Sequence, residues 1–552
     1  MTPSPPAPQP RTPWAEIALA ALPAALHAVV LLGRLHPDEL FQSLEVALHR
    51  TYGFGVVPWE WQVPPNAAAA TQPWGIRNQA VPMLLSLLFR AGDAVGLSSV
   101  SARRILAEVP QFLLHVAMLG AVWRLLARRV SEPLAHLGLW LVALYGPLVW
   151  FGGRTMSESF STAFLVWGLE RLDADDARPG WWAWGGALLG MAQVTRYGSA
   201  AVIVPAMLWL LVAKRFRTFA FATAGGLVVA FGLGLLDELT WGDWFHSLIH
   251  YVRFNVVSGA AAAQFGAQPW WTYLPRLLLA PFAFVGLFFA VRRDRWLKPG
   301  AGLLLSATVL AAGAVLLSTR FPALVTVAPW IGLLAGCALG FLLLGRETKQ
   351  PSLFIAAALG YVFILSATAH KEERFLYPAL ILLTVAAAPG FVTWAGEAWS
   401  KGPASIRSAA SPAPPPATGP LRWGRRAVVS LIAASGVAFF LFPSPYDVQR
   451  KEQFQLAAKA SRGVTGLVIM NEGMWGSPGY FYLGANVPWC PCDFPQDGCF
   501  QFATRDPRFN RGLYWSNGSD AEKPRDVQAR AAFEAAGFRF VEQRGQASLF
   551  ER

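Results

Sequence analysis

Charged residues are scarce in this chain of 552 residues, since Asp, Glu, Lys and Arg together make up only 14%. Soluble globular proteins carry about 25%. The charges are missing above all from apolar runs of roughly 20 residues, which are long enough to cross the hydrocarbon layer of a bilayer. Helices of soluble proteins are rarely apolar on every face over such a length. The sequence therefore argues against a large soluble helical protein.

Cysteine and histidine are also rare, with four and eight residues. Cys337 lies inside an apolar run, whereas Cys490, Cys492 and Cys499 lie together near the C-terminus. No histidine follows His370, so the C-terminal segment lacks the four Cys and His ligands of a structural zinc site. We predict a disulfide instead, with Cys499 joined to either Cys490 or Cys492 and one thiol left over.

What the chain does have is a series of apolar runs, which begin at Trp14 and end at Phe442. They predict a polytopic α-helical membrane protein with about thirteen transmembrane helices. The expected spans lie near residues 14–33, 103–127, 132–151, 156–171, 181–195, 198–213, 217–236, 272–291, 299–317, 323–344, 351–368, 377–396 and 427–443.

The net charge of +13 comes from basic residues clustered in short loops between these runs. This pattern is typical of cytoplasmic loops, so we expect no nucleic-acid partner. All the basic clusters can lie in the cytoplasm only if the amphipathic stretch Asn78–Phe89 lies in the membrane interface and does not span. The N-terminus is then inside and the C-terminus outside. The clusters are Arg124, Arg128 and Arg129; Lys214, Arg215 and Arg217; Arg292, Arg293, Arg295 and Lys298; Arg346 and Lys349; and Lys401, Arg407, Arg422, Arg425 and Arg426.

Composition divides the chain into a Pro-rich disordered N-terminus, a transmembrane domain, a flexible cytoplasmic linker, a last transmembrane helix and a soluble outer domain. The last part has ordinary soluble composition, and Gly466–Met470 and Phe538–Glu542 predict strands while Asp526–Ala536 predicts a helix. We expect a small α/β domain on the outer side. In order, the boundaries are 1–13, 14–400, 401–426, 427–443 and 444–552.

The loops assigned to the outer side hold most of the unusual polar residues. Asp38 and Glu39 directly follow the first span, and Glu45, the Trp59-Glu60-Trp61 run and Arg77 come after them. Acids, aromatic rings and a guanidinium within one loop favour a sugar site, because rings stack on the apolar face of a pyranose and carboxylates bind its hydroxyl groups. The alternative is that the acidic pair only solvates the end of a helix.

A second polar loop lies between two spans and contains His370, Lys371, Glu372, Glu373 and Arg374 in succession. Two or three charges would be an ordinary boundary, but five ionisable groups are dense. Arginine binds phosphate through a forked contact and lysine as a point charge, so this loop predicts a phosphate site.

Two arginines lie close to the ends of spans, Arg154 and Arg196. A guanidinium at membrane depth is costly and is normally paired or functional, although a snorkelling side chain is the alternative. A structural pair of Arg154 with Glu158 is a further alternative. A further aromatic loop contains Asp237, Asn255 and Trp270, and an interfacial aromatic belt is its alternative interpretation.

At these loops the sequence resembles glycosyltransferase family 22, the mannosyltransferases that use lipid-linked sugars, and within it the branch that builds glycosylphosphatidylinositol (GPI) anchors. Departures from the family fall in the Ala-rich loop Pro64–Gln72 and at Gln264-Phe265-Gly266, so the acceptor stays open. The shared motifs follow one another over roughly residues 14–400, as His36–Gln42, Glu45, Tyr52-Gly53, Trp59–Trp61, Gly153–Thr155, Ser157, Arg196, Phe254–Val256, Phe265-Gly266, Pro269-Trp270 and His370–Pro378.

The resemblance implies a C-type glycosyltransferase (GT-C) fold, with the catalytic machinery in residues 14–400. The expected reaction moves mannose from a polyprenyl phosphate to a hydroxyl of a lipid-linked glycan or glycolipid, with inversion to an α-linkage. Asp38 is the expected base, assisted by Glu39. Donor phosphate would be bound by His370, Lys371, Arg374, Arg154 and Arg196. Substrate would be bound by Glu45, Trp59, Glu60, Trp61, Arg77, Asp237, Asn255, Trp270, Glu372 and Glu373.

We expect no cofactor. Asp38, Glu39 and Glu372 offer oxygen ligands that Mg²⁺ or Mn²⁺ accept, but the basic residues already supply positive charge. The expected location is the bacterial inner membrane or the endoplasmic reticulum membrane, with the site and the C-terminal domain on the outer or lumenal face. Another lipid-linked sugar, such as arabinose or glucose, is an alternative donor. A transporter or flippase is a further alternative, although transporters usually show duplicated halves and none is visible here.

Overall fold

The computed structural model describes nine stretches of the chain. The spans predicted near 299–317, 323–344 and 427–443, nearly all of the span near 272–291, the loop Pro64–Gln72, the linker 401–426 and the last three basic clusters lie outside these stretches. The described residues are 11–30, 33–62, 75–174, 178–273, 352–399, 451–471, 474–493, 495–516 and 523–552.

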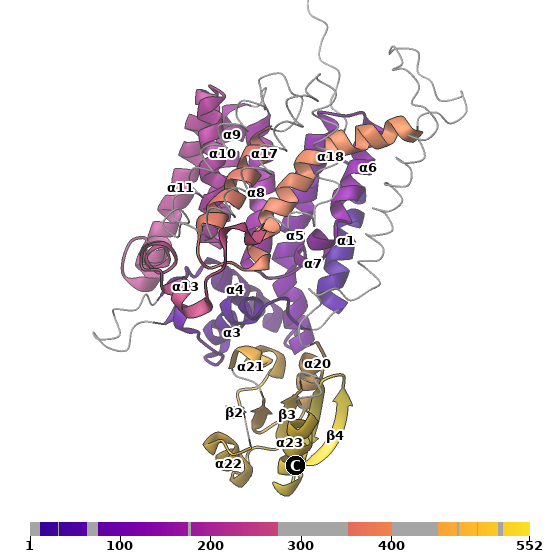
Figure 1. Cartoon of the computed structure of the whole chain (residues 1–552), viewed down its shortest axis with the longest axis vertical. Helices are drawn as coiled ribbons and strands as arrows, with labels where there is room; N and C mark the ends of the chain where they lie inside the picture. The colour runs from indigo at the N-terminus through magenta and orange to yellow at the C-terminus, as the bar shows by residue number, and fades with distance from the viewer. Residues whose placement is uncertain are drawn as a thin grey trace, which may run out of the picture.

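A bundle of apolar helices makes up the larger part of the molecule, and a small domain with a β-sheet lies against one end of it (Figure 1). Each long helix coincides with a predicted span. Within the described part of the chain, Val100–Ala127, Phe216–Trp241 and Glu373–Thr393 are long and apolar enough to cross a membrane. The long helices are α1 (Trp14–Val30), α5 (Val100–Ala127), α6 (Glu132–Ala143), α8 (Ser157–Asp173), α9 (Pro179–Thr195), α10 (Ala200–Val212), α11 (Phe216–Trp241), α17 (Ser352–Ala367) and α18 (Tyr377–Trp399).

The other helices of the described bundle connect these elements or lie across them. They are α2 (Pro37–Glu39), the π-helix η1 (Leu40–Leu44), α3 (Glu45–Tyr52), η2 (Trp59–Trp61), α4 (Ala80–Ala94), α7 (Gly146–Phe151), η4 (Tyr197–Ser199), α12 (His246–Val252), η5 (Arg253–Val257), α13 (Ala260–Phe265), η6 (Trp270–Tyr273) and η8 (Glu373–Leu376).

The predicted span at 132–151 is divided into two helices. Helix α6 ends at Ala143 and α7 begins at Gly146. Pro147 has no amide hydrogen to donate to the carbonyl of Ala143, so a continuous helix would lose a hydrogen bond at this point. The new start lets α7 pack against α1 and deliver the following loop into the bundle.

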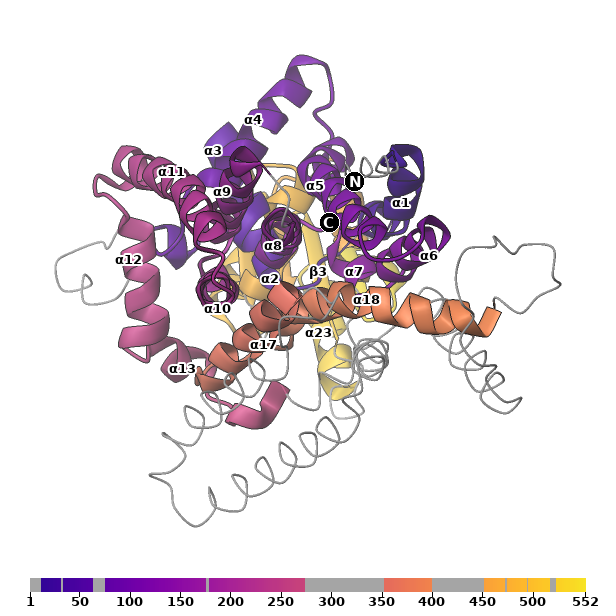
Figure 2. The ribbon, with the colours of Figure 1, turned by 90° about the horizontal axis from the view of Figure 1, so that it is seen from above.

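Helix α4 runs across the bundle and not along it. Figure 2, seen from above, shows α4 along its length while α8 and α10 are seen end-on. Its packing partners include α3 and α5. This orientation agrees with the prediction that Asn78–Phe89 lies in the interface, and the count of about thirteen spans stays a prediction.

The C-terminal domain contains a five-stranded sheet with the order β2-β1-β3-β5-β4. Strand β1 is buried along its whole length and pairs in parallel with β2 and β3, which explains its continuous apolar sequence. The predicted strands and helix are thereby confirmed. The elements are α20 (Lys451–Ala460), β1 (Leu467–Met470), η10 (Met474–Gly476), α21 (Gly479–Leu483), β2 (Trp489–Cys492), α22 (Gly498–Arg505), β3 (Arg511–Trp515), α23 (Lys523–Ala535), β4 (Arg539–Arg544) and β5 (Ala547–Glu551).

Of the two open disulfide pairings, the structure has Cys490 joined to Cys499 with their Cα atoms 5.8 Å apart, which links β2 to α22. Cys492 is buried as a free thiol. Burial raises the pKa of that thiol to about 12, so it stays protonated and unreactive at neutral pH.

The C-terminal domain shares a hydrophobic core with the bundle. Phe481 and Tyr482 of α21 pack with Phe41, Phe89 and their neighbours in one cluster. At the centre of this contact lies the Glu45 side chain, which is completely buried. The close approach requires a glycine at 479, where φ is +63° and any Cβ atom would collide with the Glu45 carboxylate.

Candidate active site

Four segments that lie far apart in the sequence meet at the end of the bundle that carries the C-terminal domain. They contribute Asp38 from α2, Glu158 from the first turn of α8, Arg196 after α9, and Arg374 from η8. Helix α2 starts at Pro37, whose fixed φ suits a first helical position, and the His36 side chain caps it by accepting from the Asp38 amide at 3.2 Å. The local sequence thus places Asp38 in the first turn of α2, beside its cap His36.

Arg374 is the centre of the cluster. Its Nη1 lies 2.7 Å from Oδ2 of Asp38 and 3.2 Å from Oε1 of Glu158, and its Nε lies 2.5 Å from Oε2 of Glu372. A buried guanidinium needs charged or polar partners, and three carboxylates provide them here. The structure therefore brings together the two loops in which the sequence placed its first and second candidate sites.

The adjacent acids Asp38 and Glu39 differ in accessibility. The Asp38 side chain keeps 22% of its surface exposed, against 5% for Glu39. Glu39 accepts from the amide of Leu35 at 2.9 Å, and its Oε1 lies 3.6 Å from Nη1 of Arg154. Of the two acids, only Asp38 can meet a substrate without rearrangement.

The ionisation of Asp38 is controlled by its neighbours. Burial disfavours the charged form, but the Arg374 guanidinium and His36 together hold the pKa of Asp38 well below its usual value. His36 also reaches Glu372, with Nε2 at 3.4 Å from Oε2, and His370 reaches the other oxygen at 3.0 Å. Asp38 is consequently a carboxylate at any physiological pH.

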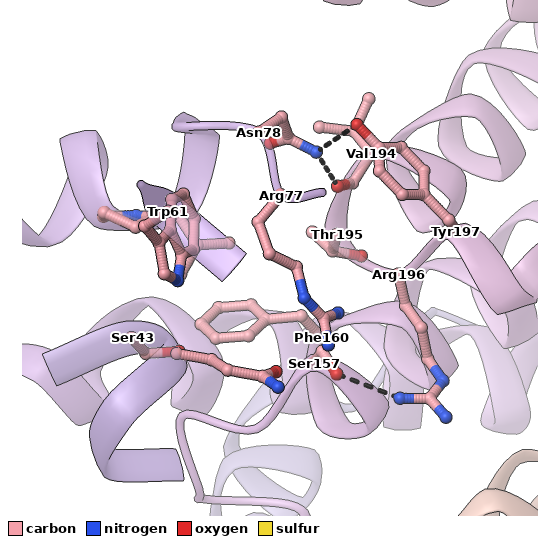
Figure 3. A pocket seen from close by; sticks show the side chains of 13 residues that line it. Ser43, Trp61, Arg77, Asn78, Ser157, Phe160, Val194, Thr195, Arg196 and Tyr197 are labelled. Carbon is pink, nitrogen blue, oxygen red and sulfur yellow. Dashed lines mark hydrogen bonds between the residues drawn. The ribbon is translucent and has the colours of Figure 1, made fainter. Parts of the chain in front are cut away.

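A pocket adjoins the cluster and encloses about 450 Å³, its open mouth included. Arg77 and Arg196 both extend toward Ser157 in it (Figure 3). Arg77 is held by Glu60, whose Oε1 lies 2.9 Å from Nη2 and also accepts from Gln42 at 3.2 Å. The pocket thus presents cationic groups close to Asp38.

The indole of Trp61 supplies a second kind of group to this pocket. Its Nε1–H is buried and has no hydrogen-bond partner among the described residues. Trp59, two residues earlier, packs instead on Phe254, with the ring centroids 5.0 Å apart. Buried donors are normally paired, so the Trp61 donor is available for a polar ligand group.

Several predicted site residues lie outside this cluster. Lys371 is buried, and it donates to the main-chain carbonyl of Gln268 at 3.1 Å and to that of Thr368. These hydrogen bonds hold the loop around Lys371 in place. Asp237 accepts from the amide and the hydroxyl of Ser247, at 3.0 and 2.6 Å. Glu45 accepts from the amides of Val56 and Phe481, at 2.7 and 2.6 Å.

The remaining predicted residues lie farther out. Asn255 donates to the carbonyl of Tyr251 in its own helical segment at 3.0 Å. Trp270 is half-buried in η6, and Glu373 is exposed. Within the described part of the chain, neither Asn255 nor Trp270 makes a hydrogen bond or ring contact with Asp38 or Arg374.

The alternative that Glu158 is a structural partner of Arg154 is wrong. Glu158 pairs with Arg196 at 2.8 Å as well as with Arg374, whereas Arg154 lies beside Glu39. The Gly153 backbone allows the Arg154 position, because a Cβ atom there would lie 2.6 Å from the carbonyl oxygen of Ala24. One signal existed: two arginines near membrane depth require an anion, and Glu158 is an acid close to a helix start.

Among the described residues, no group of three or more His, Cys, Asp and Glu side chains is arranged to hold a metal ion. Independence from metal stays a prediction.

Comparison with known proteins places this geometry in a family. The model of the Alg9-like mannosyltransferase family matches residues 14–413. The chain belongs to the Alg9-like mannosyltransferase family. The match covers the first loop, the start of α8, Arg196 and the second loop, which are the segments that meet at Arg374.

Curated relatives of this Alg9-like chain are similar but distant. Mannosyltransferase APTG1 of Arabidopsis thaliana is 26% identical over 275 residues, which are 47% of this chain and 46% of the relative. GPI mannosyltransferase 3 of Yarrowia lipolytica is 24% identical over 358 residues, 64% of this chain and 57% of the relative. The chain thus spans about half the length of the curated relatives it matches.

A solved structure has a fold similar to that of this chain. ArnT from Cupriavidus metallidurans, solved with undecaprenyl phosphate bound, superimposes with a TM-score of 0.52 at 14% identity, and 98% of each chain is covered. The predicted fold, a bundle of apolar helices with a small C-terminal sheet domain, is confirmed in this coarse form.

Proposed function

We propose that this protein is a membrane-bound glycosyltransferase that moves mannose from a polyprenyl phosphate to a hydroxyl group of a glycan or glycolipid. One observation carries the proposal: an accessible carboxylate, Asp38, lies 2.7 Å from the guanidinium of Arg374, and Arg196 lies on the other side of Glu158. Base and cations are the two requirements of transfer from a phosphate leaving group. Family membership and the mannosyltransferase names of the relatives support the sugar.

The reaction is a single displacement. The acceptor oxygen attacks the anomeric carbon and Asp38 takes its proton, while the bond from that carbon to the phosphate oxygen breaks. The electron pair of this bond leaves with the polyprenyl phosphate, where Arg374 and Arg196 stabilise the added charge. Because the acceptor enters opposite the leaving group, a β-linked donor gives an α-linked product.

The ion pair between Asp38 and Arg374 suggests how donor binding prepares the base. A carboxylate held by a guanidinium is a weak proton acceptor. A donor phosphate competes for Arg374 and loosens its contact with Asp38, which raises the proton affinity of Asp38. The base is then strongest when the leaving group is in place.

The pocket beside the cluster is the proposed acceptor subsite. Trp61 offers a ring face and a buried donor without a partner among the described residues, and Glu60 and Arg77 offer charged groups for hydroxyls. Lys214 and Arg215 follow α10, and Arg215 donates to the carbonyl of Ala174 just beyond α8, so this basic cluster lies at the other end of the bundle. By the positive-inside rule this supports a site on the outer or lumenal face.

The experiment is a transfer assay of the purified full chain in detergent, with radiolabelled sugars on polyprenyl phosphates. Mannosyl, glucosyl and arabinosyl donors are offered with a panel of mannose-containing glycolipid acceptors. We expect turnover with the mannosyl donor and an α-linked product. Turnover with only the glucosyl or arabinosyl donor would reject the mannose assignment, and no transfer from any lipid-linked sugar would reject the proposal.

A further inference from the structure

Glu158 has no part in the reaction described so far, although it lies at the centre of the cluster. It is fully buried in the first turn of α8. Its Oε1 lies 2.8 Å from Nη1 of Arg196 and 3.2 Å from Nη1 of Arg374, and its Oε2 accepts from the hydroxyl of Ser157 at 3.0 Å. One carboxylate oxygen therefore joins two cations that come from distant parts of the chain.

These two cations would not stay together unaided. Arg196 follows α9 and Arg374 precedes α18, so no single helix sets their spacing. Both guanidinium groups lie over the ring of Phe375, at 4.8 and 5.1 Å from its centroid. Two like charges at such a site repel each other unless an anion lies between them.

A phosphate group makes the same kind of contact as Glu158, because it too presents oxygens to two guanidinium groups at once. Arg196 lines the pocket, and Arg374 contacts Asp38, whose side chain keeps 22% of its surface exposed. A buried anion shared by the two arginines holds both donors in place before a ligand arrives. Such preorganisation removes the cost of assembling them during the reaction.

We infer that Glu158 is a positioning residue that holds Arg196 and Arg374 as a pair for the phosphate of a polyprenyl-phosphate donor. The inference rests on the proposed function and adds to it the two residues that must act together and the group that joins them. Glu158 itself touches neither substrate. Its effect reaches the donor only through the two arginines.

Helix α8 offers a matched control at its other end. Glu170 is buried as well, and it is contacted by Arg124, Arg128 and Arg171, at 3.1, 2.6 and 3.4 Å. Glu170→Gln therefore makes the same chemical change to the same kind of ion cluster, away from the site. Glu158→Asp is a second variant, which keeps the charge but is one methylene too short to reach both arginines.

The test measures donor KM, acceptor KM, kcat and melting temperature for the wild type and the three variants. We expect Glu158→Gln to raise the donor KM about 10- to 100-fold, the loss expected for charge-assisted contacts, with the acceptor KM nearly unchanged. Glu158→Asp should give a smaller rise. Glu170→Gln should lower the melting temperature and leave the donor KM unchanged.

Three results would overturn the inference while leaving the proposed function intact. A donor KM that is unchanged or lower in Glu158→Gln would mean that the carboxylate is neutral or opposes the phosphate. An equal rise in Glu170→Gln would mean a general structural effect. Failure of both Glu158 variants to fold would give Glu158 a structural role only. Absence of turnover in the wild type with every lipid-linked sugar would instead reject the proposed function.

Discussion

The two ends of helix α8 carry the same arrangement with different consequences. Glu158 and Glu170 lie on one helix about 18 Å apart, as a rise of 1.5 Å per residue requires. Both are buried, and each is contacted by more than one arginine: Glu158 by two and Glu170 by three. One end carries the candidate site, and the other belongs to a basic cluster that the charge pattern assigned to the cytoplasmic side.

The origin of the arginines separates the two ends. Arg124 and Arg128 lie four residues apart at the end of α5, so one helix sets their spacing before any tertiary contact forms. At the other end, the two cations come from separate segments and meet three carboxylates, of which Asp38 is partly exposed. The arginines that one helix spaces stabilise the packing of the bundle. The arginines that only the whole fold brings together belong to the candidate site.

The largest expected effect is on kcat, and it should distinguish a substitution of Asp38 from the same substitution of Asp173. Asp173 is an acid that pairs with Arg129 near the other end of α8. Asp38→Asn removes the proposed base and should lower kcat by on the order of 10²- to 10⁴-fold. Asp173→Asn should leave kcat within about twofold of the wild type, because it alters only the ion pair with Arg129, which lies away from the candidate site. Initial rates at saturating donor measure both. Retained turnover in Asp38→Asn with normal folding would remove Asp38 from the base role.

Glu170→Gln should show that the ion pairs of Glu170 stabilise the folded protein. Breaking a buried ion pair by neutralising one partner costs about 3 kcal/mol, since the arginines lose their counter-charge. Thermal unfolding in detergent measures the loss. A melting temperature equal to that of the wild type would mean that Arg124 and Arg128 find other partners, and the comparison between the two ends would fail.

Arg374→Gln should weaken donor use and change its pH dependence. The donor KM should rise about 10-fold or more through loss of charge-assisted contacts. Asp38 in the wild type has a lowered pKa, so kcat/KM falls only when acid protonates it below its usual range. Without the guanidinium, only His36 and Arg77 oppose the effect of burial, so the pKa of Asp38 should be higher than in the wild type and the acid limb of the profile should move to higher pH.

Arg128→Gln is the control for that profile, because Arg128 contacts Glu170 at 2.6 Å and not Asp38. It should leave the donor KM and the acid limb where they are in the wild type. A profile of Arg374→Gln that coincides with the wild type would show that Arg374 does not govern the ionisation of Asp38.

The smallest expected effect concerns Glu45, which the sequence assigned to substrate and the structure places between the bundle and the C-terminal domain. Its two oxygens accept from two buried amides, and a glutamine can satisfy only one of them. Glu45→Gln should therefore cost about 1–3 kcal/mol of stability and leave both KM values unchanged. A raised acceptor KM with normal stability would return Glu45 to the substrate site.

The folded protein should be more stable at acidic pH because of Glu45. Burial raises the pKa of this carboxyl from 4.5 to about 7, despite the amide hydrogen bonds that favour its charged form. The folded state therefore binds more protons than the unfolded state between these values, and its stability falls as the pH rises through that window. Glu45→Gln should lack this dependence in thermal unfolding measured from pH 5 to pH 8.

The sequence by itself determined the helical membrane class, the described long helices and the main strands of the C-terminal domain. These features depend on local periodicity and on the length of apolar runs, which each segment carries without its neighbours. Short motifs also pointed to the family and selected Asp38, Glu372 and Arg374, because ionisable groups between apolar runs are too costly to occur without a reason.

Only the tertiary structure decided which charges pair. The sequence left Glu158 open as a partner of Arg154 and assigned Lys371 to phosphate and Glu45 to substrate. The fold pairs Glu158 with Arg196 and Arg374 and gives Lys371 and Glu45 main-chain partners. Ion pairing depends on distances across the bundle, between residues more than 200 positions apart in the case of Glu158 and Arg374. No period or spacing along the chain encodes such a distance, and the two ends of α8 differ for that reason.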